Sequence, residues 1–156
     1  MQLCTLEEIK EVFNNKDCFK NEKEFCDYIE SNIETFCKEI LEVDFEDYKR
    51  ESSLVNKRFG PNKPRIDFLI KCKDGEYVLV ECKHPKNIYR ENIGALSQLM
   101  NYVLLAERYN KKVKSIWLCT TKMKDDLIEI IERFNLKINV CVLSKEHNCV
   151  WRCKNE

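Results

Sequence analysis

The 156-residue chain is long enough to bury a hydrophobic core, and its 35% charged and 44% hydrophobic residues are typical of a soluble globular protein. No apolar run approaches the ~18 residues that cross a bilayer, and the first residues, MQLCTLEEIKEVF, lack the apolar segment of a signal peptide. We therefore expect one domain over residues 1–156, no membrane partner and a cytoplasmic (intracellular) location.

The net charge is zero, but charge is unevenly distributed along the chain. Residues 1–48 hold 5 Lys or Arg against 14 Asp or Glu, whereas residues 49–90 hold 11 against 5. A basic middle segment in a neutral chain suggests a surface that faces a polyanion. Charges on solvated loops would give the same pattern, and the composition leaves both interpretations open.

Ten cysteines are many for a chain of this length, and none of them forms a C-x-x-C pair. Only Cys149 and Cys153 lie close together, as C-x-x-x-C. We interpret most of the cysteines as small core residues in a reducing compartment. A zinc or iron–sulfur site, and disulfides, are alternatives that the spacing supports less well.

Helical spacing of apolar residues dominates the first part of the chain. It predicts a short amphipathic helix over residues 5–14 and a longer one over residues 22–41, with Asn21 as the N-cap. In the longer helix, the residues expected to face the core are Phe25, Ile29, Phe36 and Ile40. The stretch from Asp44 to Val55 reads as an edge strand, and Gly, Asn and Pro predict a loop over residues 56–64.

The rest of the chain alternates strands with helices. Strands are predicted at 65–72, 76–83, 114–121 and 138–143, with a last strand in the tail, and helices at 91–110 and 124–134. The resulting order is helix, three strands, helix, strand, helix, strand. This order predicts an α/β fold with a mixed sheet.

The connection between the two central strands determines where Asp67 points. A two-residue Asp74-Gly75 turn would mix charged and core residues on both faces of the hairpin. A three-residue loop over residues 73–75, with Gly75 at its left-handed position, sorts the faces instead. One face is then wholly apolar, and it carries Ile66, Phe68, Ile70, Val78, Val80 and Cys82. Because a slip of one residue destroys this sorting, the pattern favours the three-residue loop.

The opposite face of the hairpin then carries Asp67 across from Glu81, and Arg65 across from Lys83. Two carboxylates with Cβ atoms within roughly 5 Å of each other destabilise a strand pair unless something compensates for their charge. Lys83 compensates in part, and a divalent cation would do so better. Hard oxygen ligands suit Mg2+ or Mn2+. An ordinary cluster of charged side chains on an exposed sheet face is the alternative.

The sequence of an acid, a hairpin and then Glu81-Cys82-Lys83 resembles the D…E-x-K signature of the PD-(D/E)XK nuclease superfamily, with Asp67 as the acid. Upstream, N-E-K-E-F-C-D-Y-I is similar to the start of the family's first helix, and the match makes Glu22 the helix acid. The family's nominal proline directly before the first acid is absent here.

Downstream, Gln98-x-x-x-Tyr102 in ALSQLMNYV resembles a helix motif of RecB-like nucleases, and the phrase GALSQLMNY is similar to archaeal repair endonucleases. The resemblance spans about residues 22–120. It implies a restriction-endonuclease-like core, in which a central mixed sheet is flanked by helices in αβββαβ order. It also implies metal-dependent hydrolysis of DNA in repair, recombination or restriction.

The resemblance assigns roles to residues. Asp67, Glu81, Glu22 and the Cys82 backbone carbonyl would hold Mg2+ or Mn2+, which polarises the scissile phosphate. Lys83 would orient the attacking water or help to deprotonate it, and Gln98 on the following helix would position phosphate or water. The residues expected to contact DNA are Tyr102, Arg65, Lys86, Arg90, Lys57 and Arg58.

The expected partners are DNA and a second copy of the chain, because a small nuclease that cuts both strands usually works as a homodimer. Two other functions remain open from the sequence. One is a nucleic-acid-binding module of the same fold without catalysis, and the other is an RNA endonuclease.

Overall fold

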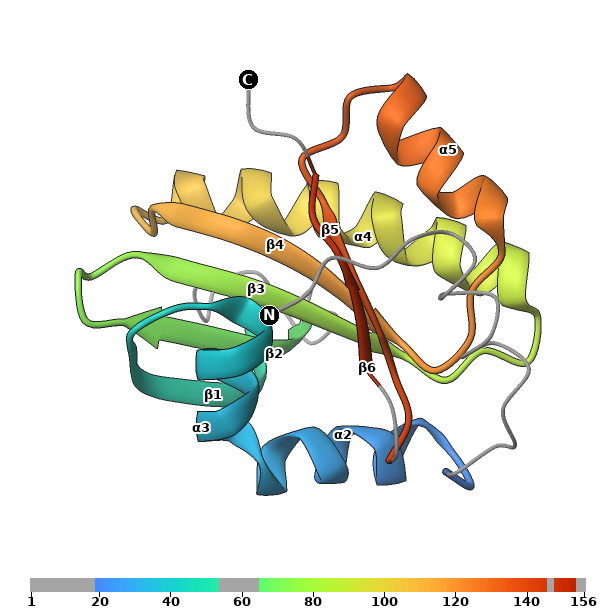
Figure 1. The fold of residues 1–156 in the computed structure, drawn as a ribbon. Coiled ribbons are helices and arrows are strands. Elements are labelled where there is room, and N and C mark those ends of the chain that lie inside the picture. Colours follow the sequence, from blue (N-terminus) through green and yellow to red (C-terminus); the bar gives the residue numbers. More distant parts are fainter. Residues whose placement is uncertain (1–18, 54–64, 146–147, 154–156) are drawn as a thin grey trace.

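The computed structural model describes residues 19–53, 65–145 and 148–153, and a six-stranded mixed sheet forms its centre (Figure 1). In spatial order the strands are β1 (Phe45–Ser53), β2 (Arg65–Cys72), β3 (Tyr77–Lys83), β4 (Val113–Thr120), β5 (Asn139–Leu143) and β6 (Asn148–Trp151). Strands β1 to β3 are antiparallel, β3 to β5 are parallel, and β6 is antiparallel to β5. The predicted α/β class with a mixed sheet is confirmed.

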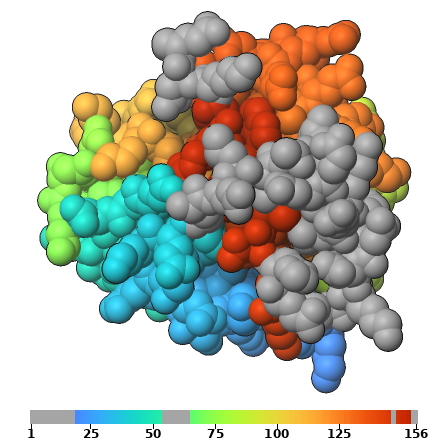
Figure 2. Space-filling model, in the orientation of Figure 1, coloured from blue at the N-terminus to red at the C-terminus, as the bar shows by residue number. Residues whose placement is uncertain are grey.

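Helices cover both faces of this sheet (Figure 1). The long α4 (Ile88–Arg108) and α5 (Asp125–Arg133) pack on one face, over a core that includes Leu79 and Leu118. The first helices, α2 (Glu22–Ser31), α3 (Ile33–Thr35) and the π-helix η1 (Phe36–Leu41), pack on the other face. In Figure 2 the segment from α2 to η1, blue to cyan, lies close to the last strands, shown in red. Helix α4 joins β3 to β4, and α5 joins β4 to β5. Both are crossover connections, which parallel neighbouring strands require.

The first described helical segment differs from its prediction. A single helix over residues 22–41 was expected, but α2 ends at Ser31, and Asn32 has φ −121° and ψ 28°. The Asn32 side chain donates a hydrogen bond to the Tyr28 carbonyl (2.9 Å), which competes with helical pairing of the backbone. The chain continues as a π-helix and stops at Glu42, which is left-handed (φ 55°). The four predicted core residues are nevertheless buried.

Most other elements lie within a few residues of their predicted bounds. The largest shift is in α4, which begins at Ile88 rather than at residue 91. Its start is fixed by Asn87, whose side chain accepts a hydrogen bond from the Arg90 N–H (2.9 Å). The predicted helix over residues 5–14 and the loop over residues 56–64 lie outside the described residues.

The described cysteines are free thiols, and seven of these eight are buried. The interpretation of the cysteines as small core residues is therefore confirmed for this part of the chain. Cys4 and Cys18 lie outside it. Among the described helices, none combines the length and the apolar character that a membrane crossing needs.

Candidate active site

The hairpin of β2 and β3 has the predicted register. Phe68 pairs with Val80 and Leu69 pairs with Leu79. The Cys72 N–H donates to the Glu76 carbonyl (2.9 Å), and Gly75 has φ +86°. The loop therefore contains three residues with glycine at the left-handed position, where a residue with a Cβ atom would be strained.

The ladder between β2 and β3 stops at the Phe68–Val80 pair. Beyond it, the Cys82 N–H donates a hydrogen bond to Oδ2 of the Asp67 side chain (2.8 Å). The Asp67 carboxylate also lies within 4.8 Å of the Cys26 and Cys82 sulfurs. The two strands thus separate at the candidate site, and a side chain takes the place of a ladder partner.

This separation corrects one detail of the predicted face sorting. Ile66 does not share a core with Phe68; it packs with Leu69 and Leu79 beneath α4. On β1, the pairs on either side place Glu51 opposite Asp67, and Glu51 has φ +51°. Both strands therefore depart from regular strand geometry at the level of Asp67, and strict alternation fails there.

Glu81 is a buried acid, with 4% of its surface exposed. Burial raises the pKa of its carboxyl group well above the ordinary value, and the hydrogen bond and the negative charge of Asp67 raise it further. The charge of Lys83 acts in the opposite direction. Among the described residues, neither Asp67 nor Glu81 forms an ion pair.

Glu22 is the first residue of α2, and Asn21 caps this helix by accepting a hydrogen bond from the Glu24 N–H (2.8 Å). Desolvation raises the pKa of Glu22, the charge of Lys83 lowers it, and the charge of Asp67 raises it. The start of α2 therefore brings a third carboxyl group, Glu22, close to the other two and to Lys83. Its role in a metal site stays a prediction.

The two predicted residues of α4 have different environments. Tyr102 is buried, and burial together with the charges of Glu81 and Asp67 raises its pKa to about 12. It therefore lies next to the acidic pair. Gln98, one turn earlier, is exposed, and its side chain makes no hydrogen bond within the described residues. The proposed contacts of both with phosphate or DNA stay predictions.

The basic residues predicted to contact DNA are only partly covered by the structure. Arg65, Lys86 and Arg90 are exposed. Arg65 begins β2, Lys86 lies just before α4, and Arg90 lies in the first turn of α4. Lys57 and Arg58 lie outside the described residues.

Two threonines that the sequence reasoning did not single out lie beside the site. The Thr121 N–H donates to the Lys83 carbonyl (3.1 Å), and Thr121 Oγ1 lies 2.7 Å from His84 Nδ1. Thr120 hydrogen-bonds to the buried Asn92 of α4 (3.1 Å). The sequence could have indicated both threonines. Neighbouring parallel strands end at the same edge of a sheet, and Thr120 and Thr121 stand at the end of β4, which lies next to the end of β3 at Lys83.

The donors at this site fit a hard divalent cation. Asp67, Glu81 and the Cys82 carbonyl offer oxygen ligands, with Glu22 nearby, and such ligands are the ones that Mg2+ and Mn2+ prefer. The raised pKa of Glu81, which burial and the neighbouring Asp67 cause, indicates a carboxyl pair whose charge Lys83 offsets only in part among the described residues. A bound cation would offset the rest.

Comparison with known proteins identifies the fold. No family model and no curated protein sequence matches the chain. A repair endonuclease from Pyrococcus abyssi matches in structure with a TM-score of 0.53 and 23% identity, over 83% of this chain and 50% of that one. An EndoMS protein in a complex with double-stranded DNA matches with a TM-score of 0.53 and 22% identity, over 85% and 49%.

The chain thus spans about half the length of the two structures it matches. Identities of this size establish a shared fold. Together with the six-stranded mixed sheet and its flanking helices, they show that the chain has a restriction-endonuclease-like fold.

Proposed function

We propose that this chain is a Mg2+-dependent endonuclease that hydrolyses phosphodiester bonds of DNA, in repair, recombination or restriction. The observation that supports it most directly is the Asp67–Glu81 pair where β2 and β3 separate, in which burial and the neighbouring Asp67 raise the pKa of Glu81. The similar structures support the same function, since one is a repair endonuclease and the other is bound to double-stranded DNA.

In this proposal, the cation is held by Asp67, Glu81 and the Cys82 carbonyl, and Glu22 is a further ligand. When bound, the cation polarises the scissile phosphate and offsets negative charge that develops during the reaction. The hydrogen bond from the Cys82 N–H fixes the Asp67 carboxylate (2.8 Å), so that one ligand is held in place before any cation arrives.

Lys83 is the cationic group of the site. Its Nζ would orient the attacking water or accept its proton, and would stabilise the negative charge that develops on the phosphate. The Thr121 N–H holds the Lys83 carbonyl (3.1 Å), which ties the end of β3 to the end of β4. The backbone from which the lysine side chain extends is therefore fixed.

The exposed Arg65, Lys86 and Arg90, with Lys57 and Arg58, would contact the DNA backbone. Contacts of basic side chains with phosphate release counterions, so binding should weaken as salt rises. We also propose a homodimer. Exposed apolar residues of α4, among them Met100 and Leu104, are available for an interface of this kind. Sedimentation equilibrium measures this directly.

The test is cleavage of plasmid, linear, single-stranded and four-way-junction DNA by the purified protein with Mg2+, Mn2+ or EDTA. Glu81→Ala should abolish cutting. Glu76→Ala is the matched control, because it removes a glutamate from the other end of the same hairpin. Cutting by Glu81→Ala at the wild-type rate would refute the proposal. DNA binding without cutting by the wild type would favour a non-catalytic module. An RNA of the same sequence as the single-stranded DNA is assayed in parallel, and cleavage of this RNA alone would favour an RNA endonuclease.

A further inference from the structure

Three side chains with metal-binding atoms converge at Asp67, which is also a member of the carboxyl pair. Cys26 of α2, Cys82 of β3 and Asp67 of β2 place two sulfurs and a carboxylate oxygen within 4.8 Å of one another. Cys82 is 0% and Cys26 5% exposed, and Asp67 is partly exposed. We call these three residues the thiol site. Three separate elements of the fold build it, and Asp67 is its contact with solvent.

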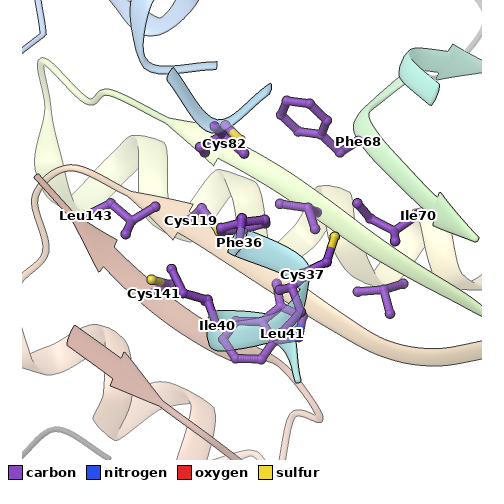
Figure 3. Close-up of a cluster of buried hydrophobic side chains, with 14 of the residues drawn as sticks. Phe36, Cys37, Ile40, Leu41, Phe68, Ile70, Cys82, Cys119, Cys141 and Leu143 are labelled. Atoms are coloured by element: carbon purple, nitrogen blue, oxygen red, sulfur yellow. The ribbon is translucent and has the colours of Figure 1, made fainter. Parts of the chain in front are cut away.

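Neighbouring groups support the positions of two of the three ligands, Asp67 and Cys82. The Cys82 N–H donates to the Asp67 carboxylate (2.8 Å), so the carboxylate and the Cys82 backbone move together. The parallel register places Cys119 of β4 beside Cys82, and Cys141 of β5 beside Cys119 (Figure 3). The surroundings on this side are therefore further polarisable sulfur atoms rather than hydrocarbon alone.

Two thiolates and one carboxylate are a ligand set for a thiophilic cation. Thiolate ligands favour Zn2+ and related ions, whereas Mg2+ prefers oxygen ligands only. Three protein ligands leave the fourth tetrahedral position to water. On binding, each thiol gives up its proton to solvent, and the sulfur donates its electron pair to the cation.

We propose that the thiol site binds one thiophilic divalent cation, Zn2+ or Cd2+, through Cys26, Cys82 and Asp67. Because Asp67 also belongs to the carboxyl pair, it cannot serve both sites fully at the same time. Occupation of the thiol site therefore withdraws a ligand from the Mg2+ site and inhibits cleavage. This second consequence rests on the proposed function, whereas the binding itself does not.

The first test measures binding alone. Cd2+ is titrated into the full chain with a phosphine reductant present, and the ultraviolet charge-transfer absorption of Cd2+–thiolate bonds is recorded. The proposal expects this absorption in the wild type and a loss of affinity of about 100-fold or more in Cys26→Ala, since a direct ligand is removed. Cys26→Ser keeps the size of the side chain and should behave in the same way if the alanine variant folds poorly.

Cys37→Ala is the matched control. Cys37 is also buried in the same core and lies near another thiol, that of Cys72, but it belongs to no ligand cluster with a carboxylate among the described residues. The control should bind Cd2+ as the wild type does. Binding by Cys26→Ser that equals the wild type, or a wild type that gives no thiolate absorption, would overturn the proposal.

The second test measures inhibition as the ratio of cleavage rates with and without micromolar Zn2+ at fixed Mg2+, within each variant. The ratio should fall in the wild type and in Cys37→Ala, and should stay near one in Cys26→Ser. Equal inhibition of all three would overturn the shared role of Asp67. A protein that binds Cd2+ through Cys26 but cuts no DNA would refute the proposed nuclease while leaving the thiol site in place.

Discussion

The β2–β3 hairpin carries acidic side chains at both ends, and their surroundings differ. At the turn, Lys114 pairs with Asp74, and Lys112 pairs with Glu76 (3.0 Å). The hydrogen bond from Lys114 holds the pKa of Asp74 below its ordinary value. At the other end, Glu81 is buried against Asp67, and its pKa is raised instead.

The acids at the turn have ion-pair partners and do not destabilise the fold. Glu81, at the other end, is ionised only at a cost in folding free energy. Acids with lysine partners at an exposed turn are neutralised locally, as most surface charges are. A buried acid such as Glu81, next to a second acid and without an ion pair in the described residues, is unfavourable by itself, and such groups concentrate at functional sites. Variants at the two ends of the hairpin test this contrast.

The largest expected effect is on cleavage. Lys83→Ala should lower the cleavage rate constant by about 100-fold to 1000-fold, because it removes the cationic group that, in the proposed function, stabilises the developing charge. Lys114→Ala removes a lysine from the turn end and should leave the rate within about twofold. Rates are measured in single-turnover assays at saturating Mg2+. Equal losses of cleavage rate in the two variants would show that the two ends of the hairpin do not differ in function.

The second effect is on stabilisation by metal. Mg2+ at 100 times its dissociation constant should raise the free energy of unfolding of the wild type by about 2.7 kcal/mol. Glu81→Gln should lose most of this gain because it removes a ligand, and Glu76→Gln should keep it. Chemical denaturation with and without Mg2+ measures the gain. A gain that Glu81→Gln retains would place the cation elsewhere.

The third effect concerns pH in the absence of metal. Folded Glu81 keeps its proton to higher pH than it does in the unfolded chain, where its pKa is near the ordinary 4.5. Above that pH the unfolded state binds fewer protons, so the free energy of unfolding falls as pH rises. Glu81→Gln should therefore melt higher than the wild type at pH 8 in EDTA, by about 3 °C for each kcal/mol gained.

The comparison for this third effect is the difference in melting temperature between Glu81→Gln and the wild type at several pH values. The difference should shrink as pH falls towards 4.5. A difference that does not change with pH would mean that Glu81 does not titrate differently in the folded chain.

The smallest effect is expected at the turn. Because the pKa of Asp74 is lowered, its ion pair contributes stability above the ordinary carboxylate pKa of 3.8 and loses it as pH falls through the lowered value. Asp74→Asn should therefore lower the melting temperature slightly at neutral pH, by less than Glu81→Gln raises it. The carboxylate is 46% exposed, so added salt should reduce the effect. Thermal melts with and without added salt measure it.

Much of this hairpin could be predicted because its chemistry is local. Strand alternation has a period of two residues, and Gly75 restricts the turn, so these two signals were enough to fix the register. The fold class followed from the order of the elements. The position of Glu22 beside Asp67 came from the resemblance to the nuclease superfamily and not from spacing.

The departures arose where tertiary contacts override local pattern. The Asn32 break in the predicted long helix depends on a hydrogen bond to Tyr28, whereas apolar spacing alone continued the helix. The change of face at Ile66 depends on the Asp67 side chain replacing a ladder partner. Cys26 was read as a core residue, and only the packing of α2 against β3 shows which ligand atoms it meets.

The hydrogen bond from Cys82 to Asp67 makes this acid a structural part of the strand, in addition to its proposed role as a metal ligand. Loss of the Asp67 side chain would leave the Cys82 N–H without its partner, and an unsatisfied buried donor destabilises a fold by about 1–3 kcal/mol. Drift away from catalysis at this position therefore also weakens the hairpin. Selection for a folded protein alone would tend to retain the acid, or an asparagine that keeps the acceptor, long after selection for activity had ended.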